Sequence, residues 1–220
     1  MIKTILSEEE SRRLDILRTY GDVFDFITFK DAISKTFSLL IDNLNEINSK
    51  ETKLSNMKVS NFDEDNNGIP TQEDEDIFRG LNELRYDRET LNERLTALSE
   101  MKVIYLYKSL EIGIKSIVRS EYPTQDITKF YILKNIVSFF QSKNIVFENL
   151  NGYLQVEELL DVNNNIKHGS KIFAKVKEIS EFKDKTELNY ENIEAFYNRI
   201  KSEVQAFSFD LCSAVFNSKQ

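Results

Sequence analysis

The sequence has little of what many enzymes and metal sites need. Its 220 residues include one cysteine, Cys212, and one histidine, His168. A single cysteine excludes a disulfide framework within the chain and a cysteine-rich zinc site, and a single histidine excludes a histidine-clustered metal centre. Six glycines and two prolines are too few for a turn-rich β-sandwich and favour long helices.

Other absences narrow the class of protein further. No apolar run in the sequence approaches the ~18 residues of a membrane span, and the acidic start does not resemble a secretory signal. We therefore expect no membrane partner and a cytoplasmic location. The sequence has no glycine-rich phosphate loop and no Cys-x-x-Cys pair, so we expect no cofactor. Cys212 is predicted to be a small buried apolar residue of the last helix.

The net charge of −8 is concentrated in one segment. Residues 57–76 hold seven acids and one lysine, a balance of −6, so the rest of the chain carries only −2. Residues 163–177, by contrast, contain four lysines and no acid: Lys167, Lys171, Lys175 and Lys177. Because a local basic surface binds polyanions whatever the overall sign of the protein, the net charge does not exclude nucleic acid.

Apolar residues recur at helical spacing along most of the chain. The spacing predicts helices over residues 7–19, 28–55, 71–120, 130–142, 154–168 and 190–216. Thr71 followed by Asp74 indicates an N-terminal cap, and Pro123 ends the long helix that this cap opens. Residues 171–179 alternate between apolar and polar and fit either a strand or an irregular helix. The fold class is therefore all-α, a helical bundle of five to seven helices, with an N-terminal helical region over 1–92 and a second domain over 93–220.

The most distinctive local feature is the run Asp161-Val-Asn-Asn-Asn-Ile-Lys-His-Gly169 near the end of a predicted helix. It resembles the motif of the HEPN superfamily, all-α domains of prokaryotic toxins, phage-defence proteins and ribonucleases. That motif reads Arg-Asn-x-x-Lys-His, and Asn164, Lys167 and His168 match it. Asn163 stands where the family has arginine. The resemblance covers roughly residues 95–215.

The resemblance implies an RNA-binding or RNA-cleaving protein of a defence or toxin-type system. It implies a homodimer with one shared cleft, and a protein partner such as an antitoxin. His168 would act as the base that takes the 2′-hydroxyl proton, supported by Asn163, Asn164, Lys167 and Glu111. The lysines that would bind RNA are Lys167, Lys171, Lys175 and Lys177.

Two features of this assignment leave alternatives open. The family arginine offers phosphate a charged, bidentate donor, which the neutral amide of Asn163 does not. The chain is therefore either a metal-independent endoribonuclease or a non-catalytic helical module that binds RNA or a partner protein. Glu111 either faces the motif or pairs with Lys108 or Lys115 on its own helix.

The acidic segment contains a partial calcium-binding pattern. Asp63, Asp65 and Asn67 match the liganding positions that begin an EF-hand loop, and Asp74 stands at the closing position. An aspartate is shorter than the glutamate that usually closes the loop, and Pro70 interrupts it. A solvated acidic linker between helices is the competing interpretation, and we expect no metal site elsewhere.

Overall fold

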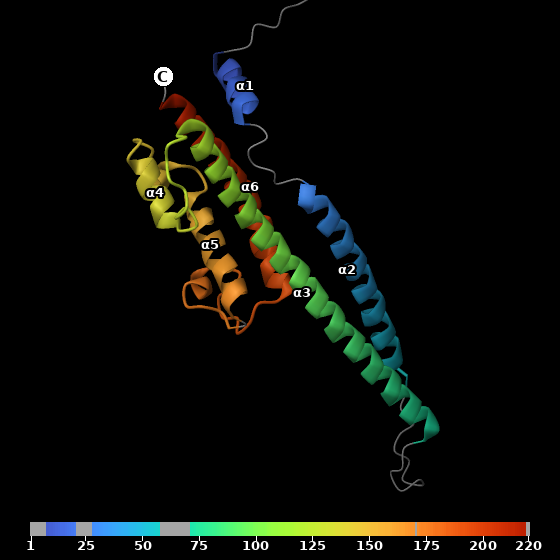
Figure 1. Ribbon diagram of the computed structural model, residues 1–220. Helices are drawn as coiled ribbons and strands as arrows, with labels where there is room; N and C mark the ends of the chain where they lie inside the picture. The colour runs from blue at the N-terminus through green and yellow to red at the C-terminus, as the bar shows by residue number, and fades with distance from the viewer. Residues whose placement is uncertain (1–7, 21–27, 58–70, 170, 219–220) are drawn as a thin grey trace, which may run out of the picture.

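The computed structural model describes residues 8–20, 28–57, 71–169 and 171–218. Within these residues, the chain folds as six α-helices and two short 3₁₀ turns. The helices are α1 (Glu8–Tyr20), α2 (Thr28–Ser55), α3 (Gln72–Glu121), α4 (Leu133–Gln141), α5 (Tyr153–His168) and α6 (Tyr190–Asn217), and the turns are η2 (Phe147–Asn149) and η3 (Val176–Glu178). The predicted all-α helical bundle is confirmed. Figure 1 shows α3 as the longest element, with the other helices arranged along it.

Local signals in the sequence set both ends of α3. Thr71 caps its N-terminus: the Thr71 hydroxyl accepts from the Asp74 amide at 3.2 Å, and the Asp74 carboxylate accepts from the Thr71 amide at 2.9 Å. At the other end, Tyr122 leaves the helical region of backbone angles, as expected for a residue that directly precedes a proline. The predicted cap and the predicted stop at Pro123 are both confirmed.

The main core lies between the C-terminal half of α3 and helices α4, α5 and α6. Its five largest fully buried side chains are aromatic: Phe140, Phe147, Phe182, Phe196 and Phe207. Phe147 joins α4 to α6, because its ring centroid lies 5.1 Å from that of Phe140 and 5.3 Å from that of Phe207. Ile16 and Tyr20 of α1 belong to the same cluster.

The start of α5 is fixed on the side of α6. Gly152 has a φ of +80°, and a Cβ atom at this position would lie 2.1 Å from the carbonyl oxygen of Glu203. Only glycine combines that backbone conformation with so close an approach. Next to it, the Asn151 side-chain amide donates to the Asp210 carboxylate at 2.6 Å. These contacts determine which face of α5 is turned towards the core.

Helix α2 and the N-terminal half of α3 form an antiparallel pair that extends beyond the main core, and we call this pair the arm (Figure 1). In both helices, apolar residues recur at alternating spacings of four and three, as in a coiled coil. They are Ile33, Phe37, Leu40, Leu44, Ile47 and Leu54 in α2, and Ile77, Leu81, Leu84, Leu91, Leu95 and Leu98 in α3. Leu44, Leu91 and Leu95 form the buried centre of the arm.

A charged pair interrupts the apolar pattern of the arm at matching positions. The Arg88 guanidinium donates to the Glu51 carboxylate at 2.6 Å, and the Glu51 side chain is only 17% exposed. Polar pairs at such positions fix how two helices align along each other. Near the end of the arm, a Cβ atom on Gly80 would lie 2.9 Å from the Leu54 side chain, so the two helices approach closely there.

Three features of the structure bear on boundaries drawn from the sequence. The division predicted between residues 92 and 93 falls inside α3, which serves both the arm and the main core. Phe130 lies in a buried turn before α4 rather than within a helix. Residues 171–179 form an irregular segment with the turn η3 and one isolated bridge, between Lys171 and Glu187.

None of the described helices combines the length and the apolar character needed to cross a bilayer.

Candidate functional site

Asn163 lies in the main core and not at a surface. Its side chain is 1% exposed, and neither its amide nitrogen nor its amide oxygen has a hydrogen-bond partner among the described residues. The neighbouring core residues Val156, Leu159 and Val162 belong to the same buried part of α5. Asn163 therefore cannot contact a substrate phosphate in this arrangement. The catalytic assignment at this position is not supported by the geometry, because both its charge and its access are wrong for that role.

Asn165, two residues further on, is fully buried but completely bonded. Its amide nitrogen donates to the carbonyl oxygens of Gly169 at 3.3 Å and Lys171 at 3.1 Å. Its amide oxygen accepts from the Phe173 backbone N–H at 2.6 Å. Asn165 thus holds the segment after α5 in place, a positioning role that the sequence analysis missed. Nothing in the run of three asparagines distinguishes one from another, except which face of α5 meets the core.

The matched motif residues lie at the C-terminal end of α5. Asn164 is half-buried, whereas Lys167 and His168 are exposed. The Lys167 ammonium lies 5.6 Å from the centre of the Tyr107 ring on α3, within the range of a cation–π contact. The Lys167 ammonium also suits the negative end of the helix dipole, so it stabilises α5 whether or not it binds a ligand.

Glu111 binds the lysines of its own helix. Its carboxylate accepts from Lys115 and, at 3.2 Å, from Lys108. Burial alone would raise the pKa of Glu111, but these two hydrogen bonds outweigh it and hold the pKa below its ordinary value. The pairing on α3 is confirmed as the alternative that describes this residue. Glu111 still lies near the motif. Burial raises the pKa of Tyr107, and the negative charge of Glu111 raises it further. Tyr107 is the residue whose ring Lys167 contacts.

The segment after α5 turns its lysines outward. Ile172 and Val176 are buried in the main core, while the alternating Lys171, Lys175 and Lys177 are exposed. The Lys175 ammonium is 4.0 Å from the Asp161 carboxylate and 78% exposed, a weak pairing. We define the basic surface as Lys167, His168, Lys171, Lys175 and Lys177. Among the described residues, Lys167, Lys171 and Lys177 have no acidic partner within salt-bridge distance.

No nearby arginine takes the place of the family arginine in the described part of α5 and α6. Arg199 of α6 reaches α5, but its guanidinium donates to Glu158 at 2.9 Å and to Glu181 at 2.6 Å. Both carboxylates occupy its donor edges. The site therefore offers exposed ammonium groups and one exposed imidazole, but no free planar guanidinium.

Two further candidate groups are explained by the fold. Asp63, Asp65 and Asn67 lie outside the described residues, and Asp74 is 5% exposed with its carboxylate bonded in the α3 cap. Among the described residues, no group of three or more His, Cys, Asp or Glu side chains is arranged to hold a metal ion. Cys212 is 4% exposed, and burial raises the pKa of its thiol to about 12, which suits the predicted apolar role.

The chemistry available at the end of α5 is the binding of a polyanion. Exposed cations supply attraction, Asn165 fixes the segment that carries three of them, and His168 supplies an imidazole at the surface. Comparisons with protein-family models, with curated proteins and with solved structures find no match to this chain, so its function is inferred from the residues of the site.

Proposed function

We propose that this chain is a HEPN-like protein of a prokaryotic defence or toxin-type system that binds RNA at the basic surface and does not cleave it. The observation that carries the proposal is Asn163, a neutral amide buried at 1% exposure, in the motif position where the family has arginine. The exposed lysines around His168 supply what binding needs. The position that should supply charge for cleavage faces the core instead.

Binding is supported by the balance of charges at the end of α5. Many cations of the fold are neutralised by a neighbouring acid, among them Arg88, Lys102, Lys115 and Arg199. Within the part of the chain that the structure describes, the lysines of the basic surface have no such partner or, at Lys175, a weak one. Contacts from four lysines to single-stranded RNA release counterions and give a slope of about −3 in a plot of log K against log salt.

The argument against cleavage is chemical. Cleavage at the 2′-hydroxyl needs a base and a donor that stabilises the charge developing on the phosphate. His168 is accessible as a base, but removing one such phosphate donor typically slows catalysis by about 10²–10³. A lysine of the basic surface is a point charge on a flexible stem, and it does not replace a planar bidentate donor.

The test is equilibrium binding of a fluorescein-labelled single-stranded RNA, followed by fluorescence anisotropy. The triple variant Lys171→Glu, Lys175→Glu and Lys177→Glu is expected to bind at least about tenfold more weakly than the wild type. A matched control reverses three exposed lysines elsewhere, Lys35, Lys53 and Lys129, and is expected to stay within about threefold. Equal loss in both variants would show that only net charge matters, and would contradict a defined RNA surface.

The homodimer with a shared cleft is part of the same proposal, and so is a cytoplasmic location. Sedimentation velocity of the purified chain measures the first directly. A dimer that persists to low micromolar concentration supports the shared cleft. A monomer at all concentrations tested contradicts the shared cleft. RNA binding is tested separately, by the anisotropy measurement.

A further inference from the structure

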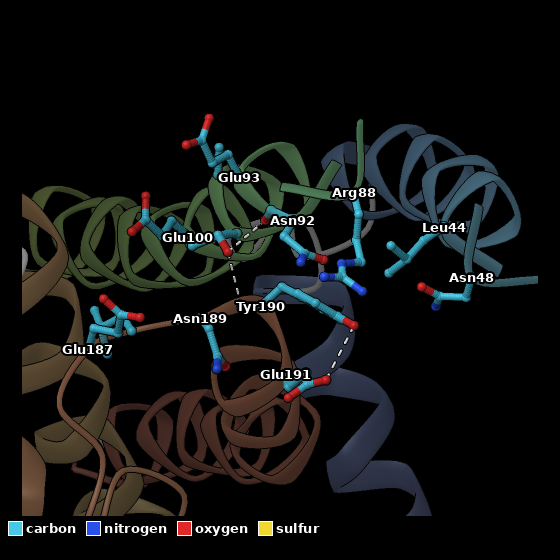
Figure 2. A pocket seen from close by; sticks show the side chains of 13 residues that line it. Leu44, Asn48, Arg88, Asn92, Glu93, Glu100, Glu187, Asn189, Tyr190 and Glu191 are labelled. Atoms are coloured by element: carbon cyan, nitrogen blue, oxygen red, sulfur yellow. Dashed lines mark hydrogen bonds between the residues drawn. The ribbon is translucent and has the colours of Figure 1, made fainter. Parts of the chain in front are cut away.

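A groove of about 740 Å³ lies where the arm meets the main core. It adjoins the basic surface, because Glu187 lines the groove and forms an isolated backbone bridge with Lys171. Figure 2 shows Leu44 of α2, Arg88 of α3 and Tyr190 of α6 turned towards a common space, with Glu93 and Glu100 of α3 projecting outward at its margin. Its apolar lining consists of Leu44, Ala97, Leu188 and the ring of Tyr190. Its polar lining includes the amides of Asn48, Asn92 and Asn189. The groove is thus partly apolar with a polar margin, as surfaces that receive a peptide are.

The groove continues the line of α6 along the arm. Helix α6 begins at Tyr190, whose backbone N–H donates to the Thr96 hydroxyl at 3.1 Å. One turn further, Glu194 accepts from Ser99 at 2.9 Å and from Lys102 at 2.8 Å. α6 therefore runs parallel to α3 from this level, and at its start it also meets α2, since the Tyr190 and Phe37 rings are 6.4 Å apart.

On the other side of Tyr190, α2 and α3 continue as a pair without a third helix among the described residues (Figure 1). The groove occupies the place beside them that α6 fills further along. The groove runs along helices, and α6 packs along the same line further down α3. The occupant that fits this geometry is therefore another helix.

The charges around the groove indicate which net charge a helix bound there would carry. Four glutamates line it: Glu93, Glu100, Glu187 and Glu191. None of them has a lysine or arginine partner among the described residues, and Glu191 accepts only a long hydrogen bond, 3.4 Å, from the Tyr190 hydroxyl. Arg88 also lines the groove, but its guanidinium is bound to Glu51 at 2.6 Å. Burial raises the pKa of Glu100, which is the behaviour of a partly desolvated carboxylate without a cation beside it.

We propose that this groove docks a basic amphipathic helix from a partner protein, with apolar side chains against Ala97, Leu188 and Tyr190 and with lysines or arginines beside the glutamates. The acidic lining repels nucleic acid, so the groove and the basic surface serve different kinds of partner. The proposal uses no residue of the RNA-binding proposal and stands or falls separately from it.

The probe for this site is a fluorescein-labelled peptide of about 18 residues, five helical turns, with leucines at helical spacing and lysines at the other positions. A second peptide with glutamate in place of every lysine is the control ligand. Fluorescence anisotropy with the full chain is expected to show saturable binding of the lysine peptide only. Failure of the lysine peptide to saturate at protein concentrations up to about 100 µM would overturn the proposal.

Two pairs of variants separate docking in the groove from attraction to an acidic protein. Ala97→Trp fills the groove without changing charge, and Ala195→Trp places the same bulk on an exposed position of α6 outside it. The first is expected to weaken peptide binding at least about tenfold, which corresponds to about 1.4 kcal/mol, and the second to change it less than about twofold. Equal effects of the two tryptophans would overturn the proposal.

The second pair removes two negative charges from different places. Glu93→Gln with Glu100→Gln neutralises the groove, whereas Glu83→Gln with Glu203→Gln makes the same charge change at exposed positions away from it. Only the groove pair is expected to weaken binding at least about fivefold and to flatten its salt dependence. If both pairs behave alike, the peptide responds to net charge and the groove is not its site.

Discussion

Replacing Asn163 by leucine is expected to stabilise the protein. The Asn163 amide is 1% exposed and neither of its polar atoms has a partner among the described residues, so folding removes it from water without restoring a hydrogen bond. An unsatisfied buried group of this kind costs about 1–3 kcal/mol. Leucine has the same number and branching of side-chain heavy atoms as asparagine, is somewhat larger, and adds no polar atom. The expected gain is therefore about 1–3 kcal/mol in the free energy of unfolding, or about 2–12 °C in Tm for a chain of this size.

The same substitution at Asn165 provides the matched control. Asn165 lies on the same helix and is buried as completely, but its amide makes three hydrogen bonds to the segment after α5. Leucine there breaks all three and leaves the Phe173 N–H and the Lys171 carbonyl unpaired. At about 1 kcal/mol for each bond, the loss is expected to reach about 3 kcal/mol.

The assay is equilibrium unfolding in urea, followed by far-ultraviolet circular dichroism, with the wild type and both variants side by side. Opposite signs for the two leucine variants confirm that the two asparagines differ in their hydrogen bonding. If Asn163→Leu destabilises the protein as much as Asn165→Leu does, the Asn163 amide has a partner in solution, and the reasoning that places it unpaired in the core is refuted.

Three further predictions concern charges. Asn163→Arg is expected to lower the free energy of unfolding by about 3 kcal/mol or more, because it buries a guanidinium without a partner. Denaturant titration measures this change. A stable variant that cleaves RNA would contradict the prediction. Glu51→Leu is expected to destabilise the arm by only about 1 kcal/mol, because Glu51 loses its pairs with Arg88 and Arg85 but Arg88 is 38% exposed and stays hydrated. A double-mutant cycle with Arg88→Leu measures the coupling, and simple additivity would disprove it. The pKa of Glu111 is held below its ordinary value in the folded state, so its contribution to stability is present above the unfolded pKa and lost as pH falls through the folded one. Glu111→Gln should therefore lower Tm at pH ~7 and have little effect at pH ~3; an equal effect at both pH values would argue against an ionised, lysine-bound carboxylate.

The helices could be predicted from the sequence because their signals are local. Periodic apolar residues indicated the helices, and a cap and a breaker indicated the ends of α3: Thr71 with Asp74 at its start and Pro123 after it. These signals depend only on neighbours within a turn or two, so they act in the same way in the sequence and in the fold.

The depth of the motif residues could not be predicted in the same way. Successive residues of a helix are rotated by about 100°, so Asn163, Asn164 and Asn165 point in three directions. The contacts of α5 with α3 and α6 decide which of them are buried, and those contacts depend on distant residues such as Gly152 and Glu203. The resemblance to a motif drew attention to this stretch of chain, but it could not show that position 163 faces inward.

The groove was also beyond local patterns. Asn48, Asn92 and Asn189 come from three separate parts of the sequence, and each is unremarkable among its neighbours. Only the antiparallel pairing in the arm and the start of α6 bring them together. The alternation of residues 171–179 left a strand and an irregular helix both open for a related reason. It reflects Ile172 and Val176 packing inward from an irregular segment that Asn165 holds.

The central claim, that the basic surface binds RNA without cleaving it, is tested most directly by the anisotropy of a labelled single-stranded RNA followed over time in excess chelator. The account predicts an immediate rise on adding the protein and then a constant value, the same for the wild type and for His168→Ala at saturation. No rise would contradict RNA binding. A rise followed by decay below the starting value, seen with the wild type and not with His168→Ala, would show that the chain is a metal-independent ribonuclease.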